Sequence, residues 1–345
     1  MIIRWSRAVV ASVLSVGCLT LAFVSPGAAS ASTKAPDASS ALIWSEPLAL
    51  DNVGLAVNSV SCPVKKFCVA VDDGQAYTYN GKKWSAPVDT SENLAAVSCA
   101  SEKFCVAVDG LGGEETYNGK KWSIPETVAA GQNLGGVSCT SSTFCAAIAY
   151  GGDTAITYNG KEWSAPVVID SGTYPDVLVG VSCASAAFCV AVDEAGQAIT
   201  YNGSTWSAPV AADPGNLLSA VSCPSTTFCA AVDQEGNILG YNGTAWGAPV
   251  NIDGTHILTS VSCTSSTFCI SVDNVGFFNV ADGDIIQTPG AAAGTVQPID
   301  TSDPDLTSVS CATTTFCVAG DSFGDYMVSS SEPAQIARTG NAGKA

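Results

Sequence analysis

The sequence predicts an all-β protein, a seven-bladed β-propeller with four-stranded blades, and three observations support this. A Cys-x5-Cys pair occurs seven times, with successive pairs beginning 37 to 48 residues apart. A period of about 40 residues indicates one supersecondary unit that is copied and stacked. Each copy contains short β-forming segments separated by Gly-containing turns, which is typical of propeller blades. The two ends of the chain each carry part of one further blade, which favours a closed ring.

Residues 94–128 show the four expected strands of one copy in order. Residues 94–99 alternate in polarity and form the first strand, residues 104–108 form the second, and the third ends at Tyr117. Asn118-Gly119 predicts a two-residue hairpin, because both residues tolerate a positive φ. We expect the fourth strand at residues 122–125, since Pro125 suits an outer edge strand.

The ends of the chain predict how the ring closes. The copy that begins at Leu306 ends after its third strand, at residues 326–328, and has no Trp-containing strand of its own. An orphan Trp-containing segment lies at residues 42–47. We expect this N-terminal strand to complete the last blade, which removes free sheet edges. A linear solenoid is the alternative, and it would leave a stray strand at one end.

The paired cysteines predict one disulfide within each blade, across the hairpin of the first two strands. Each bridge closes a short loop and is worth about 2 kcal/mol in the chain-entropy model. Zinc sites use tighter Cys spacings, so we expect no metal and no cofactor. The fourteen half-cystines are Cys62, Cys68, Cys99, Cys105, Cys139, Cys145, Cys183, Cys189, Cys223, Cys229, Cys263, Cys269, Cys311 and Cys317.

The N-terminus resembles a secretory signal. Residues 1–31 contain Arg4 and Arg7, an apolar run and a small-residue cleavage site ending at Ala31. A membrane anchor, or lipidation of Cys18, is the alternative. We therefore expect a signal peptide (1–31), a flexible linker (32–41), the propeller (42–331) and a disordered tail (332–345). This organisation predicts a secreted, extracellular protein, possible association with the cell surface, and no membrane span after cleavage.

The charge limits the classes of partner. The chain carries a net charge of −18, which argues against nucleic acid and against anionic membranes as general partners. In an antiparallel meander the first and third turns of every blade share one end. Eight of the ten lysines fall on these turns in the first three copies, including Lys82, Lys83, Lys120 and Lys121. This lysine cluster is either a solubilising surface or a site for an anionic polymer.

An aspartate follows the second cysteine of most copies by four residues, on the opposite face. A following Gly makes an Asx-type turn the structural interpretation. The functional interpretation is a ring of carboxylates that binds a ligand. The set comprises Asp72, Asp109, Asp193, Asp233, Asp273 and Asp321, and Ala149 interrupts it.

Two resemblances to known proteins rest on the repeated frame. Residues 80–88, Asn-Gly-Lys-Lys-Trp-Ser-Ala-Pro-Val, resemble the Asp-box repeat of sialidase-like propellers through Gly81 and Trp84, while Tyr79 and Lys83 depart from it. The longer frame, from Val-Ser-Cys to Trp-Ser-Ala-Pro, is similar to secreted repeat proteins of actinobacteria. Sialidases grip their substrate with three arginines. Only Arg338 follows the signal segment, so that activity is not implied.

Catalytic chemistry has few candidate residues. His256 is the only histidine, so we expect no histidine metal site. A Ser-His-Asp hydrolase is not expected either, because no nucleophile motif accompanies His256. Acidic residues are numerous, which leaves a glycoside-processing hydrolase with paired carboxylates as an alternative. We expect a monomeric, non-catalytic, lectin-like binding protein for a glycan or anionic cell-envelope polymer. A protein-interaction scaffold is the other alternative.

Overall fold

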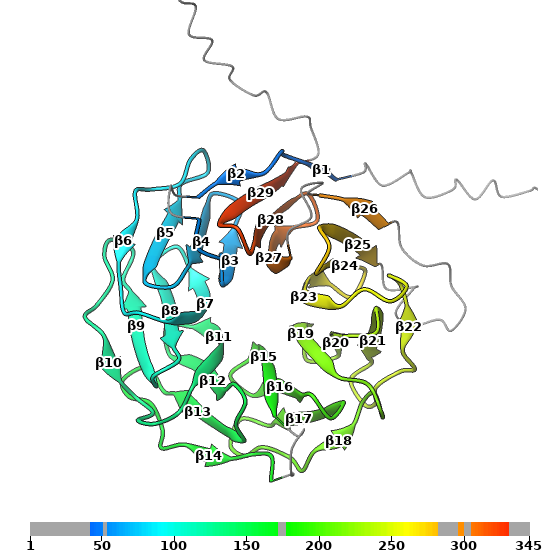
Figure 1. Cartoon of the computed structure of the whole chain (residues 1–345). Helices are drawn as coiled ribbons and strands as arrows, with labels where there is room; N and C mark the ends of the chain where they lie inside the picture. The colour runs from blue at the N-terminus through cyan, green and yellow to red at the C-terminus, as the bar shows by residue number, and fades with distance from the viewer. Residues whose placement is uncertain (1–41, 51–53, 172–176, 282–295, 300–304, 331–345) are drawn as a thin grey trace, which may run out of the picture. The chain divides into compact units, whose positions relative to one another are not determined.

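The structure is a computed structural model that describes residues 42–50, 54–171, 177–281, 296–299 and 305–330. These residues form short antiparallel strands gathered into sheets around a common axis (Figure 1). The predicted signal peptide, linker and tail lie outside the described residues. Among the described residues, no helix is long and apolar enough to cross a membrane.

Six sheets are four-stranded blades, each built from consecutive strands with the first strand innermost. Blade 1 comprises β3 (Ser59–Val64), β4 (Phe67–Val71), β5 (Gln75–Tyr79) and β6 (Val88–Asp89). Blade 2 comprises β7 (Leu94–Ser101), β8 (Phe104–Asp109), β9 (Gly113–Tyr117) and β10 (Glu126–Thr127). Blade 3 comprises β11 (Leu134–Ser141), β12 (Phe144–Ala149), β13 (Thr154–Tyr158) and β14 (Val167–Val168).

The other three blades repeat this order. Blade 4 comprises β15 (Leu178–Ser185), β16 (Phe188–Asp193), β17 (Gln197–Tyr201) and β18 (Val210–Ala211). Blade 5 comprises β19 (Leu218–Ser225), β20 (Phe228–Asp233), β21 (Asn237–Tyr241) and β22 (Val250–Asn251). Blade 6 comprises β23 (Leu258–Ser265), β24 (Phe268–Asp273), β25 (Phe277–Ala281) and β26 (Val296–Pro298).

The prediction of seven four-stranded blades is wrong, because the structure has six. The remaining sheet, which we call the closing sheet, joins the two ends of the described chain and has five strands. Its strands are β27 (Leu306–Thr313), β28 (Phe316–Asp321), β29 (Asp325–Ser330), β1 (Ile43–Trp44) and β2 (Leu48–Ala49). Both N-terminal strands pair with β29.

The missing hairpin explains the extra strand in the closing sheet. In blades 1 to 5 a single Tyr–Trp bridge, such as Tyr79 with Trp84, sits next to the Asn-Gly turn, and the ladder stops there. No turn joins β29 to β1, so pairing continues one residue further, to Ile43 opposite Ser330. The outer segment of the closing sheet therefore forms two strands, β1 and β2. The outer segment of each of blades 1 to 5 forms one isolated bridge and one strand.

The fourth strand also lies elsewhere than predicted. In blade 2 the expected strand at residues 122–125 is reduced to the bridge between Tyr117 and Trp122, and the strand β10 follows Pro125. Ser123 explains the gap, because its backbone N–H donates to the carbonyl of Thr116 while its Oγ accepts from the N–H of Thr116. A side chain and a proline interrupt the regular ladder between the bridge and the strand.

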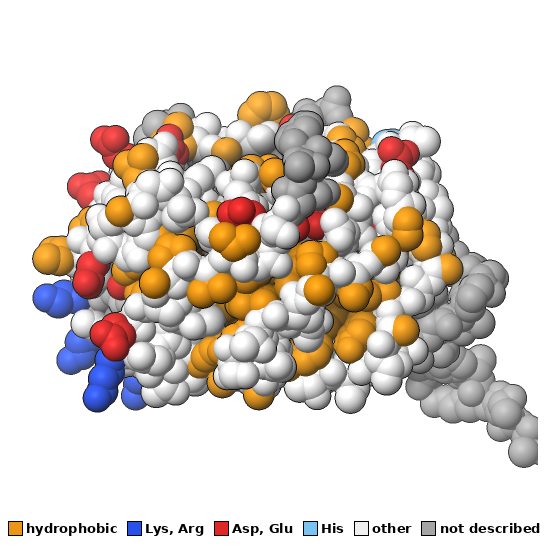
Figure 2. All heavy atoms as spheres, turned by 90° about the horizontal axis from the view of Figure 1, so that it is seen from below, with side chains coloured by type: hydrophobic (Ala, Val, Ile, Leu, Met, Phe, Trp, Pro, Cys, Tyr) orange, Lys and Arg blue, Asp and Glu red, His pale blue; other side chains and the backbone are white. Residues whose placement is uncertain are grey.

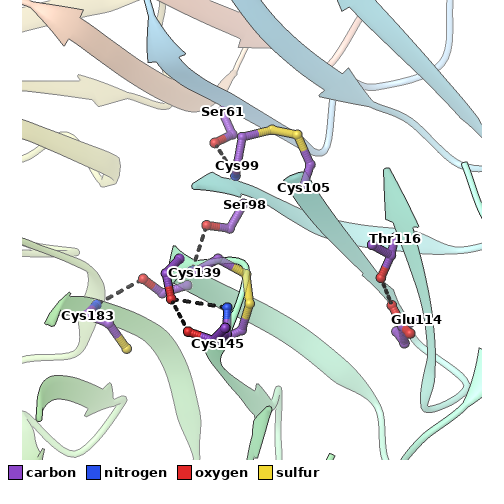
Figure 3. Close-up of a disulfide and its surroundings, with 12 residues drawn as sticks. Ser61, Ser98, Cys99, Cys105, Glu114, Thr116, Cys139, Cys145 and Cys183 are labelled. Carbon is purple, nitrogen blue, oxygen red and sulfur yellow. Dashed lines mark hydrogen bonds between the residues drawn. A yellow bond between two sulfur atoms is a disulfide. The ribbon is translucent and has the colours of Figure 1, made fainter. Parts of the chain in front are cut away.

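Hydrogen bonds from serine to cysteine join the innermost strands around the ring. In each sheet, the serine that precedes the first cysteine accepts a hydrogen bond from the N–H of the equivalent cysteine in the next sheet. Figure 3 shows Ser61 with Cys99 and Ser98 with Cys139, at 2.9 Å each. The closing sheet takes part on both sides, through the N–H of Cys311 to Ser262 and the N–H of Cys62 to Ser310. This pattern gives the repeated Val-Ser-Cys frame a physical role.

Disulfides and aromatic side chains hold the blades together internally and to one another. All seven disulfides form within their hairpins, as predicted. The hydrophobic clusters combine residues of adjacent blades, as where Val69 of blade 1 packs with Leu94 and Ala107 of blade 2. Tyr117 lies between Trp122 of its own blade and Phe67 of blade 1, with ring centroids 5.4 and 5.9 Å away. These aromatic rings therefore serve packing between blades.

Candidate binding face

The predicted lysines lie together on the first and third turns of the blades. A Cβ built on Gly81 would lie 3.3 Å from the Cα of Lys66, and one on Gly119 would lie 3.2 Å from the Cα of Lys103. These distances confirm that the two kinds of turn share one end of each blade. Lys82, Lys83, Lys120 and Lys121 are exposed there, and Figure 2 shows the basic side chains gathered on one part of the surface. Their role in ligand binding stays a prediction.

The six predicted aspartates are buried in the turns between second and third strands, and at most 5% of each is exposed. Asp193 is typical, because its Oδ1 accepts from the N–H groups of Ala195 and Gln197 at 2.9 and 2.7 Å. Asp109, Asp233 and Asp321 each accept from two backbone N–H groups in the same way. This is the structural role expected from the Asx-type spacing. It gives no support to an open ring of ligand-binding carboxylates.

The sequence analysis missed a second set of buried aspartates, each of which meets the first set across a blade boundary. Asp170, Asp213 and Asp253 follow the outermost strand by two residues and are at most 5% exposed. Asp170 shares a side-chain hydrogen bond with Asp193, and Asp213 shares one with Asp233. Burial and then the partner carboxyl raise the pKa of Asp193 to about 7 and that of Asp213 to about 6. A carboxyl with so high a pKa can hold the proton that such a pair needs.

The boundary between blades 2 and 3 carries two alanines at the same positions. The N–H of Ala129 donates to the carbonyl of Gly112, as the N–H of Asp213 donates to that of Gly196, so these two residues are equivalent. In the next blade Ala149, the residue that interrupts the aspartate set, occupies the position equivalent to Asp233, and each alanine is 2% exposed. Both members of the pair are therefore replaced together.

A hollow of about 800 Å³ opens on the face opposite the lysines. We call this the loop face, because it is formed by the turns between second and third strands and by the connections between blades. The hollow spans blades 1 to 3, and its polar side chains are the amides of Asn58, Asn93 and Asn133, the carboxylate of Asp73 and the hydroxyl of Tyr150. Leu111 adds an apolar side chain, and no lysine or arginine is among its lining residues.

Glycines and backbone hydrogen bonds fix the shape of this hollow. A Cβ on Gly135 would lie 2.2 Å from the Cβ of Tyr150, so only glycine leaves room for the tyrosine. The N–H of Tyr150 donates to the carbonyl of Asn133 at 2.7 Å. The N–H of Asn93 donates to Asp73 Oδ1 at 2.9 Å, while Asn93 itself has a φ of 63°. The lining is therefore formed by the fold before any ligand arrives.

Large apolar side chains are exposed around the same face. Leu111 and Phe323 protrude from turns between second and third strands and are 69% and 59% exposed. Tyr150 occupies the corresponding turn of blade 3 and is 48% exposed. Leu55, Leu217 and Ile257, which are less exposed, lie on the connections between sheets. Exposed apolar groups beside preformed polar ones indicate a surface suited to binding.

No family model matches the chain, and no curated protein matches it. Solved structures show the likeness of fold. YCF48 from Cyanidioschyzon merolae is 13% identical with a TM-score of 0.62, over 82% of this chain and 98% of that one. YCF48 bound to D1 peptide is 15% identical with a TM-score of 0.64, over 83% and 96%. U3-55K is 8% identical with a TM-score of 0.68, over 83% and 98%.

These similarities establish a β-propeller fold for this chain. At sequence identities of 8% to 15%, the likeness supports a shared fold and nothing about function. They do not confirm the resemblance to Asp-box sialidases or to secreted actinobacterial repeat proteins that residues 80–88 and the longer frame indicated.

Proposed function

We propose that this chain is an extracellular, non-catalytic binding protein that takes a neutral or basic polypeptide segment in the hollow of its loop face. The observation that carries the proposal is the composition of the lining. Three amide side chains, one carboxylate and exposed Leu111 and Tyr150 surround a preformed space of about 800 Å³. Amides can pair with a peptide backbone, and the apolar side chains can anchor alternate residues of an extended strand.

Charge supports a ligand that is not acidic. The chain carries a net charge of −18, and Asp73 is the only acidic or basic residue among those that line the hollow in the described part of the chain. An acidic ligand would meet like charge without a compensating cation. One of the similar propellers is described as bound to a D1 peptide, and we extend peptide binding to this chain only as a proposal. The seven disulfides support an oxidising, extracellular location.

A glycan remains the principal competing ligand. Sugar sites commonly offer an aromatic ring as a stacking surface, and Tyr150 is the single aromatic residue of the lining. Leu111, the exposed apolar side chain of the lining, is aliphatic, and the exposed aromatic Phe323 lies on a turn of the closing sheet. They fit peptide side chains better than sugar hydroxyls.

The hydrolase alternative gains nothing from the carboxyl pairs. Two-carboxylate glycosidases hold their carboxyl groups about 5 to 9.5 Å apart on either side of a sugar. Asp213 and Asp233 instead share a hydrogen bond and are at most 1% exposed. A substrate cannot reach between them.

A peptide library and a glycan array, applied in parallel to the same purified protein, test the proposal. We expect enrichment of extended peptides without acidic residues, and at least a tenfold loss of their affinity in Leu111→Asp and in Tyr150→Ala. Both side chains are exposed, so the fold should persist. Ile124→Asp is the matched control, because Ile124 is apolar, 85% exposed and on the outer segment of blade 2. Its affinity should be unchanged.

Two outcomes would overturn the proposal. Binding to glycans without binding to peptides would assign the hollow to sugars. Peptide binding that survives Leu111→Asp but disappears when Lys82, Lys83, Lys120 and Lys121 are changed to alanine would move the site to the lysine cluster.

A further inference from the structure

The boundary between blades 5 and 6 differs from the other blade boundaries because a histidine joins its carboxyl pair. Asp253 and His256 lie on the connection between β22 and β23, and Asp273 ends β24 of the next blade. One nitrogen of His256 and one oxygen of each aspartate all lie within 4.8 Å of one another. Both aspartates are buried, while His256 is exposed at the surface. The three side chains therefore meet at one place, with the two aspartates buried and the histidine on the solvent side.

The distances between these atoms match the spacing of metal ligands. Nδ1 of His256 lies 3.5 Å from Asp253 Oδ1 and 3.6 Å from Asp273 Oδ2. An N–H···O hydrogen bond would bring such atoms to about 2.7–3.2 Å. Two ligands at about 2.0–2.1 Å from a tetrahedral zinc ion lie about 3.3–3.4 Å apart. The observed separations are closer to the edge of that tetrahedron than to a direct hydrogen bond.

One oxygen of the buried Asp253 carboxylate has no donor in the described part of the chain, and a cation bound by this carboxylate would compensate its charge. Oδ2 of Asp253 has no hydrogen-bond partner among the described residues, and only 3% of the side chain is exposed. A buried carboxylate oxygen without a donor is costly. At the neighbouring boundary Asn216 replaces the histidine, and its Nδ2 donates to Asp213 Oδ1 at 3.0 Å. A cation bound through Asp253 Oδ1 would occupy the side of the carboxylate on which the asparagine donates to Asp213.

Backbone hydrogen bonds hold the three side chains in place. The N–H of Asp253 donates to the carbonyl of Gly236, and the N–H of His256 donates to the carbonyl of Asp253. The N–H of Val275 donates to Oδ1 of Asp273 at 3.0 Å, which orients Oδ2 toward the histidine. Preorganised ligands of this kind raise metal affinity, because little ordering is needed on binding.

We propose that Asp253, His256 and Asp273 form a binding site for a divalent transition metal ion of the zinc class. An imidazole nitrogen favours zinc, copper, iron or nickel over the oxygen-preferring calcium and magnesium. The two carboxylates provide the charge that a divalent ion requires. Three protein ligands leave a fourth position open toward solvent, where His256 is exposed. The ion joins blade 5 to blade 6.

The single histidine provides a direct measurement. The full chain, purified without a polyhistidine tag and stripped with a chelator, would be titrated with zinc chloride while the imidazole proton resonances are followed by NMR. His256 is the only histidine, so these signals belong to one site. We expect them to shift to saturation at one equivalent of zinc, and to move little with calcium or magnesium.

Variants then assign the ligands, with zinc affinity measured by calorimetry. His256→Asn copies the residue that blade 4 carries at this position, so it should fold, and we expect it to lose at least tenfold in affinity. Asp253→Asn should show a similar loss, whereas Asp213→Asn, at the neighbouring boundary, should bind zinc as the parent does. Unchanged affinity in His256→Asn would overturn the proposal. So would zinc saturation without any change in the histidine resonances, because the ion would then lie elsewhere.

Discussion

The paired aspartates at the blade boundaries are buried and close to each other, so their protonation state affects the stability of the fold. Oδ2 of Asp193 and Oδ2 of Asp213 have no hydrogen-bond donor among the described residues, although each aspartate shares a hydrogen bond with its partner carboxyl. Two carboxylates cannot form that bond without a proton between them. One shared proton per pair satisfies both observations, and the alanines at the boundary of blades 2 and 3 avoid the need for it.

This shared proton makes stability depend on pH. The pKa of Asp213 rises from 3.8 to about 6 on folding, so the native state binds more protons than the unfolded state between these values. The contribution of the pair is therefore complete below about pH 4 and is lost as the pH rises through about 6. We expect Asp213→Asn, which needs no proton to donate to Asp233, to show a smaller fall in melting temperature between pH 5 and pH 8. Calorimetric scans at both pH values measure this, and an equal fall in both proteins would contradict it.

One member of each pair could be predicted from the sequence and the other could not. The Asp-x-x-Gly spacing of Asp193 and its equivalents indicated an Asx-type turn, because that interaction is local. Asp170 lies 23 residues before Asp193, and Asp213 lies 20 before Asp233. Their meeting depends on how one blade stacks on the next. The same reason hid the approach of His256 to Asp273 and the hollow beside Tyr150.

Among the elements, the turn between the second and third strands has two structural roles. It surrounds the buried aspartate where its own blade has one, and it holds the connection to the next blade. In blade 4 the carbonyl of Gly196 accepts from the N–H groups of Ala212 and Asp213, so this turn also anchors the connection to blade 5. Gly196 has a φ of 76°, and a Cβ on it would lie 2.0 Å from the carbonyl oxygen of Asp213. The glycine is required both by its backbone conformation and by the chain that passes over it.

Substitutions at two glycines of this region can distinguish the effect of the positive φ from the effect of the backbone that passes close by. Gly215 has a φ of 96° but would place its Cβ in open space. We expect Gly215→Ala to destabilise the protein by about 1–2 kcal/mol, from the left-handed conformation alone. Gly196→Ala should cost about 1–3 kcal/mol more, because the added methyl group also collides with backbone. Denaturant unfolding under oxidising conditions measures both, and equal losses would show that the collision relaxes freely.

Local sequence also explains which elements were predicted well. The first two strands of each blade and the disulfides follow from short-range patterns, and the structure confirms them. The Asn-Gly pair does mark the position of a hairpin, but its predicted geometry is wrong: the N–H of Asn118 donates to the carbonyl of Lys121, so Gly119 and Lys120 are the central residues, and Gly119 rather than Asn118 has the positive φ. The fourth strand was misplaced in blade 2, because the Trp-Ser-x-Pro motif forms a bridge and a side-chain hydrogen bond before the ladder resumes at Glu126. A motif with strand-like residues therefore need not mark the strand itself.

At the scale of the whole molecule, two features close the ring. One is the serine–cysteine hydrogen bond that recurs between neighbouring sheets, and the other is the five-stranded closing sheet. The serine of every Val-Ser-Cys frame links neighbouring sheets. The number of cysteine pairs in the sequence therefore equals the number of these links. What the repeat could not reveal is the extra strand of the closing sheet. That strand depends on the absence of a covalent turn between Ser330 and Ile43, which only the joining of the two ends makes apparent.

The closing sheet therefore should be more sensitive to substitution than a regular blade. Trp44 packs against a cluster that contains Leu42 and Met327, and Ser45 exchanges two hydrogen bonds with Val328. Trp246 occupies the equivalent place in blade 5, but there the Asn242-Gly243 hairpin keeps the outer segment beside its sheet. In the closing sheet, only such non-covalent contacts hold β1 and β2 on β29.

We expect Trp44→Ala to lower the melting temperature more than Trp246→Ala, by a further ~4 °C or more, since about 1 kcal/mol shifts a domain of this size by roughly 2–4 °C. Both tryptophans are half-buried, so the loss of packing alone is comparable. Hydrogen exchange should accelerate at the amides of Ser45 and Val328 in Trp44→Ala, and stay slow there in Trp246→Ala. Equal melting temperatures, with Val328 equally protected in both variants, would mean that the ends of the chain do not determine how firmly the ring is closed.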